Sequence, residues 1–175
     1  ELLILATDWG YEGNYDSFFS KIKKDGYNGC ETWLPGEEKY RMELAAAAQK
    51  HGLVFGIMFG IADADVEKNK REFIAGLEQA VALKPIYINC HTAKDHFSFE
   101  QLKPFFEYTI QLSKRTGIPI YHETHRGRAL YSAPVAAKFL ENIPDLKVTA
   151  DLSHWCNVHE SFLEDQEETM KLVLE

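Results

Sequence analysis

The sequence contains no apolar run near the roughly 20 residues that a membrane-spanning helix needs, so we expect no membrane contact. It shows no secretory signal peptide, although it begins with Glu1 rather than Met, which leaves an upstream piece open. Its three cysteines are odd in number and form no disulfide framework. We therefore predict reduced thiols in a cytoplasmic protein, with Cys30 and Cys90 packed inside apolar strands.

Positive charge is also scarce. The chain has 19 lysines and arginines against 27 aspartates and glutamates, which gives a net charge of −8. Because phosphate neutralisation dominates nucleic-acid binding, this balance argues against a nucleic-acid partner, although a local basic patch could coexist with it. The glycine-rich loop of nucleotide-binding folds is missing as well, since DWGYEG at 8–13 has the wrong glycine spacing.

What the chain does contain is an ordinary globular composition, 45% hydrophobic and 26% charged, which predicts a single domain, 1–175, with its own core. Apolar runs alternate with amphipathic segments six times. We expect strands at 1–8, 27–34, 53–59, 86–91, 118–122 and 147–150. We expect helices at 14–24, 37–50, 66–83, 98–116, from 132 and from 162 onward. Asn14 and Ser98 are the expected caps of two of them.

Two α/β architectures fit this alternation: an open doubly wound sheet and the eight-fold (β/α)8 TIM barrel. Five of the six expected strands lead into a polar residue: Asp8, Glu31, His91, Glu123 and Asp151. A barrel builds its site from the C-terminal ends of several strands, whereas an open sheet gathers it at one switch point. The pattern therefore favours the TIM barrel, of which this chain holds about six βα units at roughly 31 residues each.

Two short runs at neighbouring strand ends carry the strongest chemical signal: YHETH at 121–125 and DLSHW at 151–155. Each follows an apolar lead-in and changes abruptly to carboxylate and imidazole. Burying unpaired charge is costly, and a metal ion is the simplest partner that makes such a cluster favourable. Carboxylates with imidazoles suit Mn, Zn, Co, Fe or Mg better than soft metals. The two runs therefore predict a divalent metal site.

Three motifs resemble the xylose-isomerase-like barrel superfamily, and more narrowly the bacterial proteins called sugar phosphate isomerase/epimerases: GYNGCE at 26–31, HETHRGR at 122–128 and DLSHW at 151–155. The resemblance covers the whole chain as ordered βα units. It implies that Glu123 and Asp151 are metal ligands and that His154 lies beside the metal, as a ligand or a substrate contact. In that superfamily a strand-seven His and a strand-eight Glu complete the site, and this chain ends before both strands.

The resemblance also implies the reaction, which is the isomerisation or epimerisation of a sugar or sugar phosphate. Such an enzyme removes a proton next to a carbonyl while a metal stabilises the enediolate, and a carboxylate moves the proton. Glu123 is the expected acid/base group, and His154 is the second catalytic candidate. The structural alternatives are an ion pair of Glu123 with a nearby arginine and packing of His154 on Trp155.

The expected substrate contacts lie at or just beyond strand ends. They are Glu31, His91, His125, Arg126 and Trp155. Four of them have a structural alternative: an ion pair for Glu31, a satisfied rim histidine for His91, a solvated charge for Arg126, and core packing for Trp155. Arg126 and Arg128 together could clamp a phosphate or carboxylate of the substrate.

Two further expectations concern aromatic and buried side chains. Trp9, Trp33 and Trp155 are candidates for the wall of a sugar-binding cleft, with ordinary core packing as the alternative. Because side chains alternate along a strand, His122 should point away from Glu123, into the core or behind the site.

Three other functions stay open. A keto-inositol-type dehydratase begins with the same proton abstraction, so the sequence does not separate it from an isomerase. An abasic-site endonuclease calls for an additional strand-three histidine, which IMFG at 57–60 does not offer. A non-catalytic scaffold on a barrel remnant would leave two sheet edges, which a homo-oligomer could close. If the protein is an enzyme of sugar metabolism, as the resemblance implies, we expect its partner to be a small-molecule carbohydrate substrate.

Overall fold

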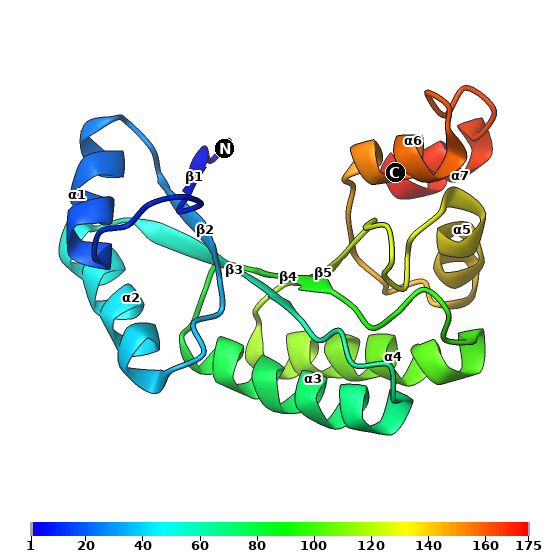
Figure 1. Ribbon diagram of the computed structural model, residues 1–175, viewed down its shortest axis with the longest axis horizontal. Coiled ribbons are helices and arrows are strands. Elements are labelled where there is room, and N and C mark those ends of the chain that lie inside the picture. The colour runs from blue at the N-terminus through cyan, green and yellow to red at the C-terminus, as the bar shows by residue number, and fades with distance from the viewer. Residues whose placement is uncertain (1, 175) are drawn as a thin grey trace.

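Six parallel strands alternate with helices in the computed structural model, which describes residues 2–174 (Figure 1). The strands are β1 (Leu5–Thr7), β2 (Gly29–Trp33), β3 (Val54–Gly60), β4 (Ile88–His91), β5 (Ile120–Glu123) and β6 (Val148–Thr149). They pair in chain order, β1-β2-β3-β4-β5-β6. Because the order of these strands never reverses, the sheet is a partial TIM barrel, and the doubly wound alternative is wrong.

The helices lie outside the curved sheet, which leaves its concave face free (Figure 1). They are α1 (Tyr15–Lys24), α2 (Glu38–His51), α3 (Val66–Ala82), α4 (Phe99–Thr116), α5 (Ala133–Asn142), α6 (Leu152–His159) and α7 (Glu167–Leu174). The core fills the space between helices and sheet with large buried side chains such as Phe19, Phe73 and Phe106. Cys30 and Cys90 are free thiols buried in this core, as predicted.

Local sequence signals account for where two of the helices begin. The side chain of Asn14 accepts a hydrogen bond from the backbone N–H of Ser17 and caps α1. Ser98 and Gln101 form a reciprocal capping box at the start of α4. Both predicted caps are confirmed, and Gly117 in the left-handed conformation follows the end of α4.

The C-terminal part corrects the prediction of one helix from residue 162 onward. The helix α7 lies within that range, but an additional helix, α6, precedes it and begins at Leu152, just after β6. Asp151 caps α6 by accepting a hydrogen bond from the backbone N–H of Ser153, and Glu160 ends it in the left-handed conformation. The DLSHW run is therefore the first turn of a helix rather than a loop, which decides where His154 points.

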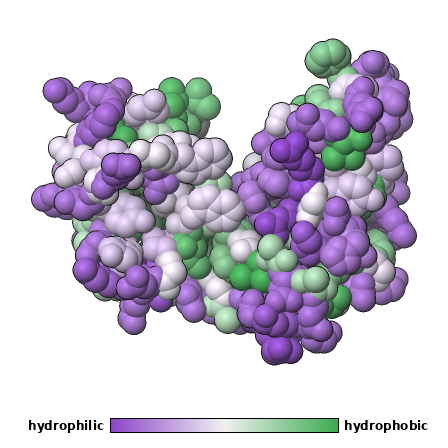
Figure 2. All heavy atoms as spheres, in the orientation of Figure 1, coloured by the Kyte–Doolittle hydropathy of each residue, from purple (hydrophilic) through white to green (hydrophobic). Residues whose placement is uncertain are grey.

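Strand register brings polar side chains together on the concave face. Trp33 is paired with Met58, Met58 with Asn89, and Asn89 with Tyr121. Residues paired in this way face the same side of a parallel sheet, and so do the residues two positions further along each strand. The result is a pocket of about 910 Å³ at the C-terminal ends of the strands. Figure 2 shows the hollow between the two arms of the molecule.

The fold bears on two predictions, one about membrane contact and one about the edges of the sheet. Between residues 2 and 174, no helix combines the length and apolar character needed to cross a bilayer. β1 and β6 are the outer strands of the six-stranded sheet. The prediction that a homo-oligomer covers these edges stays a prediction.

Candidate metal centre

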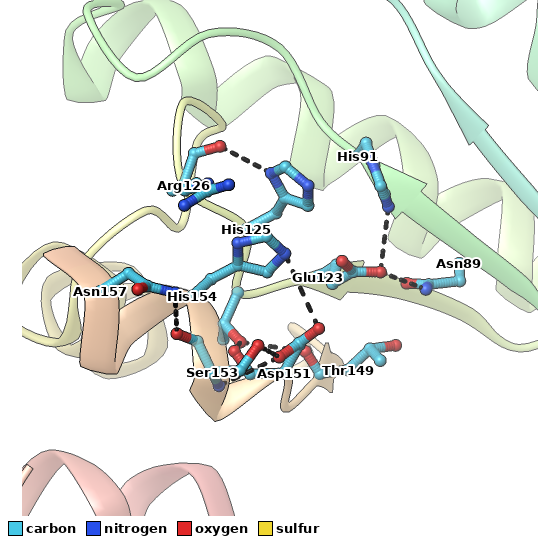
Figure 3. A network of polar contacts seen from close by, with 11 residues as sticks. Asn89, His91, Glu123, His125, Arg126, Thr149, Asp151, Ser153, His154 and Asn157 are labelled. Carbon is cyan, nitrogen blue, oxygen red and sulfur yellow. Dashed lines mark hydrogen bonds and ion pairs between the residues drawn. The ribbon is translucent and has the colours of Figure 1, made fainter. Parts of the chain in front are cut away.

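Glu123, the last residue of β5, lines the pocket, and its carboxylate faces Asn89 and His91 (Figure 3). Its Oε2 accepts a hydrogen bond of 2.6 Å from Nδ2 of Asn89 and lies 3.0 Å from Nε2 of His91. Burial works to raise the pKa of Glu123, but His91, helped by Asn89, holds it below its usual range. The carboxylate is therefore fixed by its neighbours and ionised near neutral pH.

Three imidazoles form a row beside this carboxylate. The ring centroids of His91 and His125 are 4.5 Å apart, and those of His125 and His154 are 3.8 Å apart. Nδ1 of His125 is 2.6 Å from the backbone oxygen of Arg126, which fixes the ring. Burial is the main cause that lowers the pKa of His125, which favours the neutral ring that a metal requires.

Asp151 and His154 come from the first turn of α6. Oδ2 of Asp151 lies 3.7 Å from Nε2 of His154. Burial tends to raise the pKa of Asp151, but the hydrogen bonds from Ser153 and the proximity of His154 bring it below its usual value. As the N-cap, this carboxylate also sits at the positive end of the helix dipole, which favours its ionised form.

The ligand atoms of these residues fall into two overlapping groups that share Glu123. One group is His91, Glu123 and His125, and the other is Glu123, Asp151 and His154; within each group the atoms lie within 4.8 Å of one another. Two carboxylates at this separation repel each other unless a cation lies between them. In addition, Nδ1 of His154 is buried and unpaired within residues 2–174. The donor set thus fits the divalent metal ion predicted from the sequence.

A third carboxylate lines the same pocket. Oε1 of Glu31, on β2, accepts a hydrogen bond of 2.9 Å from the hydroxyl of Tyr87. Burial raises the pKa of Glu31 above its usual value, and the Tyr87 hydrogen bond offsets part of this rise. Glu31 and Glu123 therefore have pKa values shifted in opposite directions, which is typical of two carboxyls with different tasks.

The structure corrects the predicted role of Trp155. This side chain is 0% exposed, and its indole N–H donates to the backbone oxygen of Leu130, 2.9 Å away. Because Trp155 follows His154 on a helix, it points about 100° away from it, into the core rather than the pocket. Trp155 is therefore no substrate contact, and core packing, the alternative, holds.

Arg126 and Arg128, which follow β5, have different structural roles. Nη1 of Arg128 donates to the backbone oxygens of Ile61 and Ala93, so Arg128 ties three loops together. Neither arginine pairs with Glu123 among the described residues, so the ion-pair alternative for Glu123 is wrong. Arg126 is exposed and does not line the pocket, and its substrate contact stays a prediction.

Trp9 and Trp33 line the pocket, as expected of a cleft wall. They are 67% and 41% exposed, and the Trp33 ring packs edge-on against His91 at 4.9 Å. His122 points the other way, into the core, where the hydroxyls of Thr92 and Thr109 lie 2.6 and 2.8 Å from its two nitrogens. Burial lowers the pKa of His122 to about 3. The prediction that His122 points away from Glu123 is confirmed.

Sequence reasoning missed Asn89 and Tyr87, both of which line the pocket. The signal was available, because these residues lie two and four positions before His91 and alternation puts all three on one face. Asp8, unlike the polar residues at the ends of the other strands, does not line the pocket. Its carboxylate accepts a hydrogen bond from the hydroxyl of Thr32.

Fold and site together define a parallel βα barrel with a carboxylate–imidazole centre at the C-terminal ends of its strands. The family described as Xylose isomerase-like TIM barrel matches residues 19–173. This chain belongs to that family, as its three motifs predicted. A search of curated protein sequences found no match.

Two solved structures share this fold. The apo form of 3-keto-D-glucoside 4-epimerase, YcjR, from E. coli is 18% identical, with a TM-score of 0.69 over 97% of this chain and 76% of that one. The probable 3-DHS dehydratase AsbF, involved in petrobactin synthesis, from Bacillus anthracis is 15% identical, with a TM-score of 0.66 over 98% and 71%. At these identities the likeness concerns the fold.

Proposed function

We propose that this protein is a divalent-metal-dependent isomerase or epimerase of a sugar. The observation that carries the proposal is the meeting of Glu123, Asp151 and His154 within 4.8 Å in one pocket. Barrel enzymes carry their chemistry at this end of the strands. A sugar epimerase with the same fold supports the choice of substrate class.

The residues of the pocket divide the work. Glu123, Asp151 and His154 would hold the cation, with His91 and His125 beside it. A bound divalent cation polarises a substrate carbonyl. Glu123, kept ionised by its neighbours, would take the proton from the carbon next to the carbonyl. Return of that proton to the former carbonyl carbon, with transfer of the neighbouring hydroxyl proton to the former carbonyl oxygen, gives the isomer. Delivery of a proton to the opposite face of the original carbon, by a second group, gives the epimer.

The first test is the metal content of the purified chain by mass spectrometry, for the wild type and for Glu123→Gln and Asp151→Asn. Asparagine is as good an N-cap as aspartate, so Asp151→Asn leaves α6 in place. Asp145→Asn is the matched control, because Asp145 is exposed and pairs with Lys114. We expect near-stoichiometric Mn, Zn, Co or Fe in the wild type and the control, and loss in the two site variants. Since Mg exchanges readily, a metal-free result is followed by titration with added cations.

Two results would overturn the proposal. The first is a wild type that binds no divalent cation even on titration, which would favour the scaffold hypothesis. The second is a metal-loaded protein that exchanges no carbon-bound proton of any sugar for deuterium in heavy water, followed by NMR. Formation of a product that has lost water would assign the protein to the dehydratases instead. Gly60 ends β3 where a nuclease would need histidine, so no observation favours that function.

A further inference from the structure

Next to the candidate metal centre, the pocket has a second polar wall made by β2, β4 and the residue just before β4. It contains Glu31, Tyr87 and Asn89. Glu31 is paired with Gly56 in register, and a Cβ atom on Gly56 would lie only 2.5 Å from Cζ of the Tyr87 ring. The absence of a side chain at Gly56 therefore lets Tyr87 reach across β3 to Glu31.

The hydroxyl of this wall and one N–H of its amide donate their hydrogen bonds inside the protein. The Tyr87 hydroxyl donates to Oε1 of Glu31, and Nδ2 of Asn89 donates to Glu123. The acceptors, in contrast, are free. Oδ1 of Asn89 is buried without a partner within the described residues, and no hydrogen bond between residues 2 and 174 reaches Oε2 of Glu31. A ligand that satisfies this wall must bring donors, as a row of hydroxyl groups does.

The charge of the pocket points to the same kind of ligand. Within residues 2–174 its lining includes the carboxylates of Glu31, Glu123 and Asp151 but no lysine or arginine. Arg126 is exposed outside the lining, and Arg128 is committed to backbone oxygens. A phosphate placed against the second wall would meet the carboxylate of Glu31 with no lysine or arginine of the lining beside it.

We propose that Glu31 and Asn89, with Glu31 positioned by Tyr87, bind the hydroxyl groups of an uncharged polyhydroxylated substrate in preference to its phosphate ester. The ligand lies with its hydroxyls against this wall and an apolar face toward Trp33. This inference rests on the proposed function only in placing the reacting carbonyl at the metal centre.

The test is the binding of matched probes to the purified chain, with and without Mn²⁺, by ligand-observed NMR and calorimetry. The probes are D-fructose, D-glucose and D-xylose, each paired with its terminal phosphate ester, and myo-inositol. We expect the uncharged members to bind more tightly than their esters. Glu31→Gln should weaken this binding at least tenfold, because it replaces a carboxylate acceptor by an amide. Glu107→Gln on the exposed face of α4 is the control and should change nothing.

Tyr87→Phe tests the positioning role, because it keeps the ring but removes the hydroxyl. It should weaken binding of the same probes several-fold while leaving the melting temperature and metal content unchanged. When Tyr87→Phe is combined with Glu31→Gln, the loss of binding free energy should be smaller than the sum of the two single losses, because Tyr87 acts through Glu31. Full additivity would overturn the positioning role.

Tighter binding of a phosphate ester than of its parent compound would overturn the inference, as would the absence of binding by every uncharged probe. Both outcomes are independent of the metal analysis. Binding of uncharged probes that depends on Glu31, in a chain that holds no metal, would leave this inference standing and reject the proposed reaction. Metal binding that requires Glu123, without any preference for uncharged probes, would reject this inference and leave the proposed reaction standing.

Discussion

Asn89 donates a hydrogen bond of 2.6 Å to Oε2 of Glu123, the same oxygen that lies 3.0 Å from Nε2 of His91. Two residues of β4 thus hold the carboxylate at the end of β5. Asn89 sits directly beside Met58 and Tyr121 in the register of the sheet, so its orientation is set by the strand pairing. The carboxylate is oriented before any ligand binds, which reduces the free energy that a ligand spends on ordering it.

Asn89→Leu should weaken the binding of a divalent cation by roughly 10- to 100-fold. Leucine resembles asparagine in shape but offers no donor, so Glu123 loses one of the groups that lower its pKa. Calorimetric titration with Mn²⁺ measures the effect. Asn142→Ala is the control, because Asn142 is exposed and bonds only to a helix carbonyl within the described chain. Unchanged cation affinity would show that Asn89 plays no part in orienting Glu123.

The buried ring of His122 makes stability depend on pH. Thr109 donates its hydroxyl to the backbone oxygen of Phe106, so it accepts from Nε2–H of His122, and Nδ1 accepts from Thr92. The ring is neutral, and burial lowers its pKa to about 3 from 6.5. The unfolded chain therefore takes up a proton first as pH falls, and the native state loses up to about 1.4 kcal/mol per pH unit below 6.5.

Between pH 6.5 and 5 this amounts to about 2 kcal/mol, which urea denaturation at a series of pH values would detect. His122→Leu should flatten the slope in this interval, although it lowers stability at pH 8 because Thr92 loses its acceptor and Thr109 loses a donor. His96→Gln, at an exposed site, should leave the slope as it is. An equally steep slope in His122→Leu would contradict the assignment.

Gly76→Ala should destabilise the packing of α3 on β3. A Cβ atom at this buried position would lie 2.1 Å from Cζ of Phe59, so the aromatic ring must move. Overpacking of this kind lowers the free energy of unfolding by about 1–3 kcal/mol, which outweighs the better helix propensity of alanine. Thermal denaturation measures the change. Gly36→Ala meets no atom within 4 Å and should be nearly neutral. Equal stability of the two variants would show that the contact relaxes at no cost.

Arg128→Met should cost about 1–3 kcal/mol of stability, because the guanidinium joins the loops after β3, β4 and β5. Its removal leaves the backbone oxygen of Ala93 without its donor and that of Ile61 with Asn69 alone. The exposed Arg126→Met should cost almost nothing. Chemical denaturation of both variants provides the comparison. If Arg126→Met proved the more damaging change, the structural roles assigned to the two arginines would be reversed.

Much of the fold follows from local patterns. Apolar runs that alternate with amphipathic segments predicted all six strands in chain order, and the caps at Asn14 and Ser98 predicted two helix starts. The error at α6 has a local cause as well. The carboxylate of Asp151 fits a metal ligand and an N-cap equally well, and only the second role predicts the helix that carries His154.

The order of the βα units and the position of Glu123 and Asp151 at neighbouring strand ends follow from the sequence alone, because both depend on patterns within a few residues. Which side chains share a wall depends on the packing of the folded chain. Trp155 belongs to the core because the helix turns it away from the pocket. Glu31 and Tyr87 are separated by 56 positions and meet because β3, between them, carries Gly56 at the crossing point. Register between strands and the space left by one missing side chain are properties of the packed sheet, and no local pattern encodes them.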